Sequence, residues 1–244
     1  MAKRSLRHTT RSLDTIITVV ITPIAMMLLF VFVFGGSFQQ TLGDVNYVDF
    51  ITPAIIIMTV VSGIAYAAVR LSMDLQKGII NRFKTMPVAP SSILGGHAAS
   101  STLSNLFSSV LVLAVAFLIG FRSEAGVSEW LLFSGLLILF TLATTWLAIL
   151  FGLFAKTVEG AGAFSYILIF LIFISAGFTT VDTMHPALRW FAENQPMTPI
   201  IETMRSLLMT GTAGDSAVLA IGWCVGLLVV SYVLALRVYK TKTI

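Results

Sequence analysis

Charged residues are scarce in this 244-residue sequence, because Asp, Glu, Lys and Arg together make up only 11% of it. Soluble domains carry about 25% charged residues, so the composition excludes an ordinary water-soluble globular protein. The single cysteine, Cys224, excludes an internal disulfide and any cysteine-based metal site. The three histidines, His8, His97 and His185, lie far apart and without ligand spacing, so we expect no metal site.

Motifs for nucleotide hydrolysis and for common hydrolytic chemistry are also missing. The sequence has no Gly-x-x-x-x-Gly-Lys-Ser/Thr loop, no Gly-x-Ser-x-Gly elbow and no His-Glu-x-x-His pair. We therefore expect that the chain is not an enzyme and holds no cofactor. The net charge of +4 and the pI near 9.4 do not indicate nucleic-acid binding, because the basic residues flank apolar runs as membrane anchors do.

Long apolar runs are what the sequence has instead. A helix needs about 20 predominantly apolar residues to cross the hydrocarbon core of a bilayer, and six stretches meet this condition. None contains Asp, Glu, Lys or Arg, and none alternates as the strands of a barrel do. The sequence therefore predicts an all-α membrane protein with one transmembrane domain over residues 1–244. The six predicted spans cover residues 16–36, 50–69, 97–120, 130–155, 161–181 and 217–236.

The Lys and Arg residues are distributed unequally between the two sides of these spans. Twelve fall in the N-terminal arm, in the second and fourth connections and in the C-terminal tail, whereas three fall on the other side: Arg122, Arg189 and Arg205. Cytoplasmic loops of membrane proteins carry the excess of Lys and Arg. We therefore expect a multi-pass protein of the cell membrane with both termini in the cytoplasm. The basic N-terminal arm is expected to form an amphipathic helix on anionic membrane lipid.

Small polar residues form two adjacent stripes along the third predicted span. Residues four apart lie on one face of a helix. The stripes consist of Ser100, Ser104 and Ser108 and, one position further on, of Ser101, Asn105 and Ser109. Close helix packing with interhelical hydrogen bonds and a role in lining a substrate path both fit this pattern.

The connection from residue 70 to residue 96 is too long for a simple turn. In it, Leu75, Ile79 and Phe83 lie four apart and polar residues occupy the opposite face, which predicts a short amphipathic helix. Pro87 is expected to end that helix. The pattern fits two interpretations equally: a helix resting on lipid headgroups, or one that docks into a groove on a cytoplasmic partner.

The segment from residue 182 to residue 216 is also long and contains two short apolar stretches. A turn at Asn194, Gln195 and Pro196 separates them. Two short helices joined by such a turn can dip back into the outer leaflet where neighbouring protein covers their backbone. We interpret this segment as a re-entrant helix pair that acts as a gate at the outer mouth.

The second of these helices carries its own start and stop signals. Thr198 is expected as its N-cap with Pro199 at the first helical position, and Gly211 is expected to end it. Glu202 and Arg205, three residues apart, are spaced for an ion pair. We expect that pair to be exposed to water and to contribute little to stability.

Two runs of this sequence resemble one known family. The run from Lys77 to Pro90, KGIINRFKTMPVAP, resembles the inner loop of ABC exporter permeases of the daunorubicin-resistance type. The outer run from Phe191 to Pro199, FAENQPMTP, followed by Glu202 and Arg205, resembles their outer segment. The sequence departs from the family at Pro90, where such permeases commonly have Arg.

The resemblance implies a permease subunit that exports amphipathic drugs, antibiotics or lipid-like molecules. Two permease subunits, as a homodimer or a heterodimer, would join two ABC ATP-binding subunits, which would hold the ATP and magnesium. The residues of the expected coupling helix and its exit are Asp74, Lys77, Gly78, Asn81, Arg82, Phe83, Met86 and Pro87. The residues of the expected outer gate are Asn194, Gln195, Pro196, Pro199, Glu202 and Arg205.

Two other functional classes stay open on the sequence. The same docking loop would serve a membrane scaffold or a sensor subunit that does not transport. A secondary carrier fits less well, because such carriers keep ionisable residues inside the membrane as relays and the six predicted spans have none.

Overall fold

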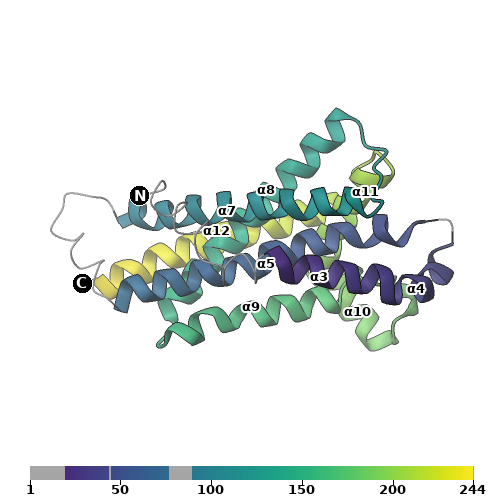
Figure 1. Ribbon diagram of the computed structural model, residues 1–244. Coiled ribbons are helices and arrows are strands. Elements are labelled where there is room, and N and C mark those ends of the chain that lie inside the picture. The colour runs from purple at the N-terminus through teal and green to yellow at the C-terminus, as the bar shows by residue number, and fades with distance from the viewer. Residues whose placement is uncertain (1–19, 44, 77–89, 244) are drawn as a thin grey trace.

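The computed structural model describes residues 20–43, 45–76 and 90–243, and the secondary structure in these ranges is helical. Long helices lie side by side along one axis, and short helices gather at one end (Figure 1). The helices are α3 (Thr22–Leu29), η2 (Phe30–Phe34), α4 (Gly35–Leu42), α5 (Tyr47–Gln76), α7 (Pro90–Leu118), α8 (Val127–Phe154), α9 (Val158–Phe173), η3 (Val181–Thr183), α10 (Pro186–Asn194), α11 (Met197–Met209) and α12 (Ala217–Thr243).

Five helical stretches in the described ranges are long and apolar enough to cross a membrane. They are Thr22–Gln39, Tyr47–Gln76, Leu94–Leu118, Val127–Phe154 and Ala217–Thr241. The first of them joins α3, the π-helical segment η2 and α4 into one run. These five confirm an all-α membrane protein, and each overlaps a predicted span. The predicted N-terminal amphipathic helix lies outside the described residues.

The remaining predicted span, residues 161–181, is helical only in part. Its helix, α9, has 16 residues and ends at Phe173, which is shorter than the about 20 residues that span a bilayer. The chain turns there because Ser175 intervenes: its hydroxyl donates to the Ile172 carbonyl at 2.6 Å and accepts from the Gly177 amide at 3.1 Å. The segment 174–180 continues as a non-helical turn, called the α9 turn below.

Helices α5 and α7 extend further than their predicted spans at the end that carries their connection. The predicted span 50–69 lies within α5, which continues to Gln76, and α7 begins at Pro90 rather than at His97. The long connection between them therefore shortens to residues 77–89, which lie outside the described residues. Asp74 belongs to the last turn of α5 and not to a separate amphipathic helix.

Helix α5 occupies the centre of the bundle and packs against α3, α7, α8 and α9. Its side chains are buried along most of its length, and Ile55, Ile57 and Ile64 have no exposed surface. Gly152 of α8 lets the two backbones approach closely, since a Cβ there would lie 2.9 Å from the Ala68 carbonyl oxygen. Such contacts between small residues are a common basis of helix packing in membranes.

Candidate outer gate

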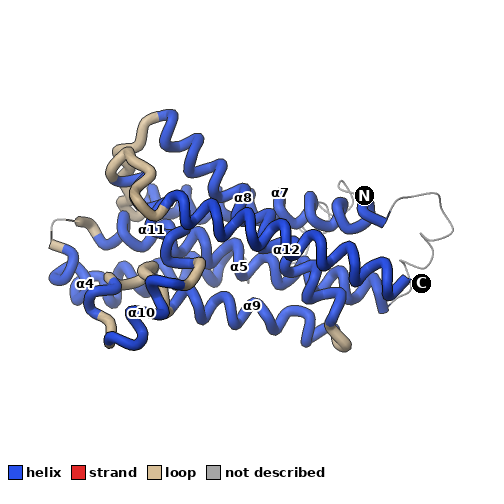
Figure 2. The backbone as a smooth tube through the Cα atoms, turned by 180° about the vertical axis from the view of Figure 1, so that it is seen from behind, coloured by secondary structure: helices blue, strands red, loops and turns tan. Residues whose placement is uncertain are grey.

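The short helices α10 and α11 lie at the end of the bundle opposite to the C-terminal end of α12 (Figures 1 and 2). Their two-helix arrangement confirms the predicted pair of short helices around a turn at Gln195 and Pro196. Gly211 follows α11 with a φ of 66°, so the predicted glycine stop is also confirmed. Most side chains of α11 are buried, including Ile200, Ile201 and Met204 at 0% exposure.

The prediction that Thr198 caps α11 is wrong. The helix begins two residues earlier than predicted, at Met197 and not at Pro199, and Pro196 stands at the N-cap. The Thr198 hydroxyl instead accepts a hydrogen bond from the Ala176 amide at 3.3 Å. A backbone amide in the buried α9 turn needs an acceptor, and the first turn of α11 supplies it.

Arg205 binds the carbonyl oxygens of two other segments. Its Nε donates to the Phe50 carbonyl at 2.9 Å, and its Nη2 donates to the carbonyls of Ala176 at 2.7 Å and Gly177 at 3.2 Å. The guanidinium carbon also lies 3.6 Å from the centroid of the Phe50 ring, within the range of a cation–π contact. One side chain of α11 thus joins the first turn of α5 to the α9 turn.

Burial lowers the pKa of Arg205 to about 10, while the charge of Glu202 acts in the opposite direction. The guanidinium therefore stays positively charged at neutral pH. The predicted ion pair between Glu202 and Arg205 is not formed, and Nε and Nη2 of the guanidinium donate to carbonyl oxygens. Glu202 accepts a hydrogen bond from the Ser216 hydroxyl at 2.9 Å instead and so ties α11 to the approach of α12.

Gln195 makes a second link to the end of α9. Its Nε2 donates to the Leu171 carbonyl at 2.8 Å and to the Ile174 carbonyl at 3.3 Å. Asn194, by contrast, donates to the Trp190 carbonyl within its own helix. Of the predicted gate residues, Gln195, Glu202 and Arg205 make long-range polar contacts, and Asn194, Pro196 and Pro199 shape α10 and α11 themselves.

Several residues that were not predicted complete this group around Arg205, which is called the outer cluster below after the predicted outer gate. The Tyr47 hydroxyl donates to the Phe178 carbonyl at 3.3 Å, and the Phe30 ring lies 4.7 Å from the Phe178 ring. Gly177 leaves room for its neighbours, since a Cβ there would lie 2.9 Å from the Ala54 Cβ. A glycine among aromatic residues was the one available signal, and it does not reveal partners distant in sequence.

The connection between α7 and α8 also contacts this cluster. The Arg122 amide donates to Asp49 Oδ1 at 2.8 Å, and the Ser123 hydroxyl donates to the Leu208 carbonyl at 2.7 Å. Asp49 lies in the first turn of α5, and Leu208 in the last turn of α11. The ends of α5, α7 and α11 that lie beside Arg205 are therefore joined by hydrogen bonds as well as by apolar packing.

Arg189 of α10 makes one ion pair within its own helix and one with Asp182 of η3, on the exposed side of the cluster. Arg189 lies 2.7 Å from Glu193 and 2.9 Å from Asp182. The hydrogen bond to Glu193, followed by the charges of Asp182 and Glu193, raises the pKa of Arg189 above its usual value. Exposed pairs of this kind contribute little to stability, so the buried contacts of α11 dominate the attachment of the pair.

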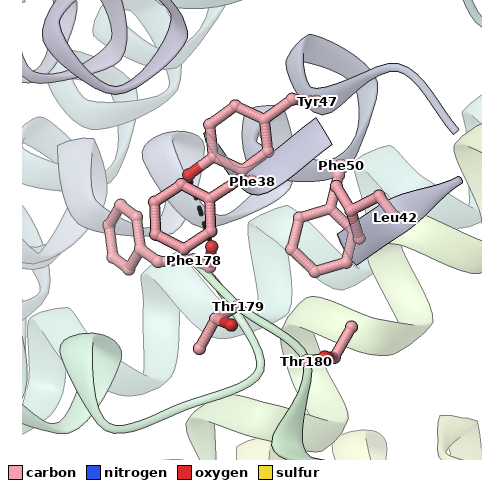
Figure 3. A pocket seen from close by; sticks show the side chains of 7 residues that line it. All are labelled: Phe38, Leu42, Tyr47, Phe50, Phe178, Thr179 and Thr180. Carbon is pink, nitrogen blue, oxygen red and sulfur yellow. Dashed lines mark hydrogen bonds between the residues drawn. The ribbon is translucent and has the colours of Figure 1, made fainter. Parts of the chain in front are cut away.

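A shallow pocket lies between α4, the start of α5 and the α9 turn, and its side chains leave no enclosed room for a water-sized molecule (Figure 3). Phe38 and Tyr47 stack in its wall with ring centroids 5.2 Å apart. Sites for drug-sized molecules have volumes of about 300–1,000 Å³. The pocket is therefore smaller than a substrate site. It is lined by Phe38, Leu42, Tyr47, Phe50, Phe178, Thr179 and Thr180.

At the opposite end of the bundle, Asp74 is the one predicted coupling residue within the described ranges. Its Oδ2 lies 3.4 Å from His97 Nε2, so the last turn of α5 contacts the inner part of α7. The other predicted coupling residues, Lys77, Gly78, Asn81, Arg82, Phe83, Met86 and Pro87, lie outside the described residues. Among the residues described, no three His, Cys, Asp or Glu side chains are grouped to hold a metal ion.

Residues 1–209 match the family described as ABC-2 type transporter. The chain is 28% identical over 229 residues to the daunorubicin resistance ABC transporter permease protein DrrB1 of Streptomyces coeruleorubidus, across 93% of this chain and 80% of that protein. It is 23% identical over 228 residues to the probable doxorubicin resistance ABC transporter permease protein DrrC of Mycobacterium tuberculosis (strain ATCC 25618 / H37Rv), across 93% and 82%. Since the family match covers most of the chain, this multi-pass membrane protein belongs to the ABC-2 type transporter family.

Proposed function

We propose that this chain is the permease subunit of an ATP-driven exporter of amphipathic drug, antibiotic or lipid-like molecules. Relatives named as daunorubicin and doxorubicin resistance permeases support this substrate class. The ATP and magnesium belong to two separate ATP-binding subunits. Those subunits dock on the connection at residues 77–89, which follows α5 directly.

The continuity of α5 is the observation that carries the proposed mechanism. One uninterrupted helix of 30 residues leads from the Phe50 carbonyl, which accepts from Arg205, to Asp74 beside the connection. A displacement of the connection is therefore carried along one helix, in which Pro53, one turn from Phe50, is the interior proline. In the exporter, closure of the ATP-binding subunits on ATP pushes the connection, and α5 carries that movement to the outer gate.

The gate itself is the pair α10 and α11, which we propose to be re-entrant from the outer face. Its buried α11 is anchored by Arg205 to α5 and to the α9 turn. The pocket at this end is too small for a drug-sized molecule, and in the proposed exporter the substrate path forms between two permease subunits. A second permease subunit, identical or related, completes that path, and the termini lie in the cytoplasm.

Co-purification with the ATP-binding subunit tests this proposal directly. The chain is co-expressed with a candidate ATP-binding subunit, reconstituted in vesicles and assayed for ATP hydrolysis and for export of daunorubicin. Stable association and drug transport that requires ATP are expected. Association without any transport would favour a scaffold or sensor subunit, and failure to associate would overturn the proposal.

Single substitutions in the connection test the coupling role. Arg82→Ala and Phe83→Ala are expected to reduce export at least tenfold while membrane insertion and ATP binding by the partner persist. Lys156→Ala, in the connection between α8 and α9, serves as a matched basic control. Normal export by both Arg82→Ala and Phe83→Ala would remove the coupling role from this connection.

A further inference from the structure

Polar side chains without hydrogen-bond partners gather in the interior of the bundle, away from the Arg205 cluster. Among the described residues, six of these buried atoms belong to α7 and α8. The side chains of Asn105, Ser109 and Thr145 are only 2%, 2% and 0% exposed. The unpartnered atoms are Ser100 Oγ, Thr102 Oγ1, Ser104 Oγ, Asn105 Nδ2 and Ser109 Oγ on α7, and Thr145 Oγ1 on α8.

The unpartnered α7 residues follow one another along about 13.5 Å of helix, from Ser100 to Ser109. Asp49 of α5 contacts Arg122, just beyond the end of α7, and Asp74 of α5 contacts His97 of α7. The two aspartates are separated by the same number of residues as their two partners. Counting between these contacts places Ser62 of α5, itself buried, within about one turn of the level of Ser109.

Thr145 of α8 approaches the same part of α7 from the third helix. The Phe117 ring of α7 contacts the Trp130 ring of α8, with centroids 6.3 Å apart. Counting inward from this contact along two antiparallel helices places Thr145 within one turn of Asn105 and about two turns from Ser109. Three helices that pack against one another thus contribute to one polar region about two turns long, called the polar layer below.

Some hydroxyls beside the layer are satisfied by their own helices. Ser108, Thr141 and Thr144 donate to the carbonyl four residues earlier at 2.7–3.0 Å, which is the usual solution for such residues in helices. Asn105 differs, because its amide nitrogen has two donor hydrogens and no partner among the described residues. Thr145 and Ser109 are likewise unpartnered although both are buried.

An unpaired polar group that is buried away from water is costly, and proteins rarely tolerate several together. Water molecules bound in protein interiors make about three hydrogen bonds each to such groups. The residues of the layer are uncharged, which suits a neutral ligand that both donates and accepts. Water has this chemistry and is small enough to enter between packed helices.

We propose that the layer around Asn105, Ser109 and Thr145 is a binding site for ordered water molecules between α5, α7 and α8. The waters bridge α7 to its neighbours in place of direct side-chain bonds. A water bridge exchanges partners more readily than a direct bond, so the layer lets α7 shift against α8. The water site goes beyond the proposed export function and does not depend on it.

Radiolytic labelling tests the site on the full chain in lipid nanodiscs. X-rays convert water beside a side chain into hydroxyl radicals, which oxidise a nearby thiol. The near-isosteric variants Ser109→Cys and Thr145→Cys place a thiol in the layer, and mass spectrometry gives its oxidation rate. Leu103→Cys and Phe107→Cys are matched controls at the same depth, since their side chains are 51% and 61% exposed on the outside of the bundle. The native Cys224, buried elsewhere, is an internal reference.

The proposal predicts that the thiols at positions 109 and 145 are oxidised at least tenfold faster than those at 103 and 107. Oxidation no faster than in these controls would show that the layer is dry and would overturn the proposal. Adding Asn105→Leu to Ser109→Cys should reduce its oxidation severalfold, because an anchoring group is lost. Unchanged oxidation there would overturn the assignment of Asn105 to the site. Neither result depends on whether the chain exports drugs.

Discussion

The outer cluster and the interior polar layer differ in whether their buried polar groups have hydrogen-bond partners within the protein. Around Arg205, the donors of α11 meet carbonyl oxygens of other segments at 2.7–3.2 Å. Around Asn105, buried donors and hydroxyls have no partner among the described residues. Direct bonds fix a geometry, whereas unpaired groups leave it adjustable. The difference indicates that the outer cluster moves as one body and that adjustment occurs further in.

Arg205→Met should have the largest effect. It leaves the carbonyls of Phe50, Ala176 and Gly177 without their donor, and we expect a loss of about 3 kcal/mol or more of stability. Thermal unfolding can be followed through the exposure of Cys224 to a thiol-reactive dye, because this thiol is buried in the folded chain. Arg205→Lys keeps the charge without the planar fork of donors and should lose less. An unchanged melting temperature in Arg205→Met would show that the hydrogen bonds of Arg205 do not stabilise the outer cluster.

Gly177→Ala should rank second. The added Cβ would lie 2.9 Å from the Ala54 Cβ and 3.3 Å from Ile201 Cδ1, in a turn that packs tightly on both sides. Overpacking of this kind costs about 1–3 kcal/mol. Gly222→Ala on α12 is the matched control, since nothing lies within 4 Å of its added Cβ. Equal melting temperatures for the two variants would show that the α9 turn yields easily.

Asn105→Leu should change stability by less than about 1 kcal/mol, because no direct hydrogen bond to protein is lost and an apolar side chain of similar size replaces the amide. The same unfolding assay measures this change. A loss as large as that of Arg205→Met would mean that the amide has a strong protein partner. The polar layer would then be held by direct hydrogen bonds within the protein, as the outer cluster is.

Arg189→Gln should have the smallest effect. Its ion pairs with Asp182 and Glu193 are exposed, and such pairs contribute about 0–1 kcal/mol. We expect a shift of less than about 0.5 kcal/mol at physiological salt and a slightly larger one at low salt, where screening is weaker. A destabilisation of several kcal/mol would show that α10, and not α11, anchors the outer pair.

The sequence predicted the fold class and the outer pair because these follow from local patterns. A long run without charge predicts a membrane span, Pro196 predicts a turn and Gly211 predicts the end of a helix. Each of these predictions depends on one segment alone. The partners of Arg205 were not predictable in this way. Phe50 and Ala176 are 155 and 29 residues distant from it, and they bind through backbone carbonyls that every residue has. The expected pair with Glu202 failed for the same reason, since the competing acceptors leave no trace in the sequence.

The limits of α9 and α5 show a related difficulty. The absence of charge extended the predicted span to residue 181, because the α9 turn, ISAGFTT, has no charged residue although it is less apolar than α9. A hydrogen bond from Ser175 and the approach of Thr198 end the helix at Phe173. For α5, the charge of Arg70 marked the end of the apolar run, although the helix continues to Gln76. Hydropathy marks the membrane boundary and not the end of the helix.

The length of α5 has a mechanical consequence. At about 1.5 Å per residue, its 30 residues extend about 45 Å, whereas the hydrocarbon core is about 30 Å thick. Asp49 and Arg70 bracket a stretch that matches the core, so the last turns of α5 project beyond it. A long helix anchored near one end by Arg205 and projecting beyond the core at the other can act as a lever. A sideways push on the projecting end, which Asp74 joins to His97 of α7, would become a tilt at the anchored end.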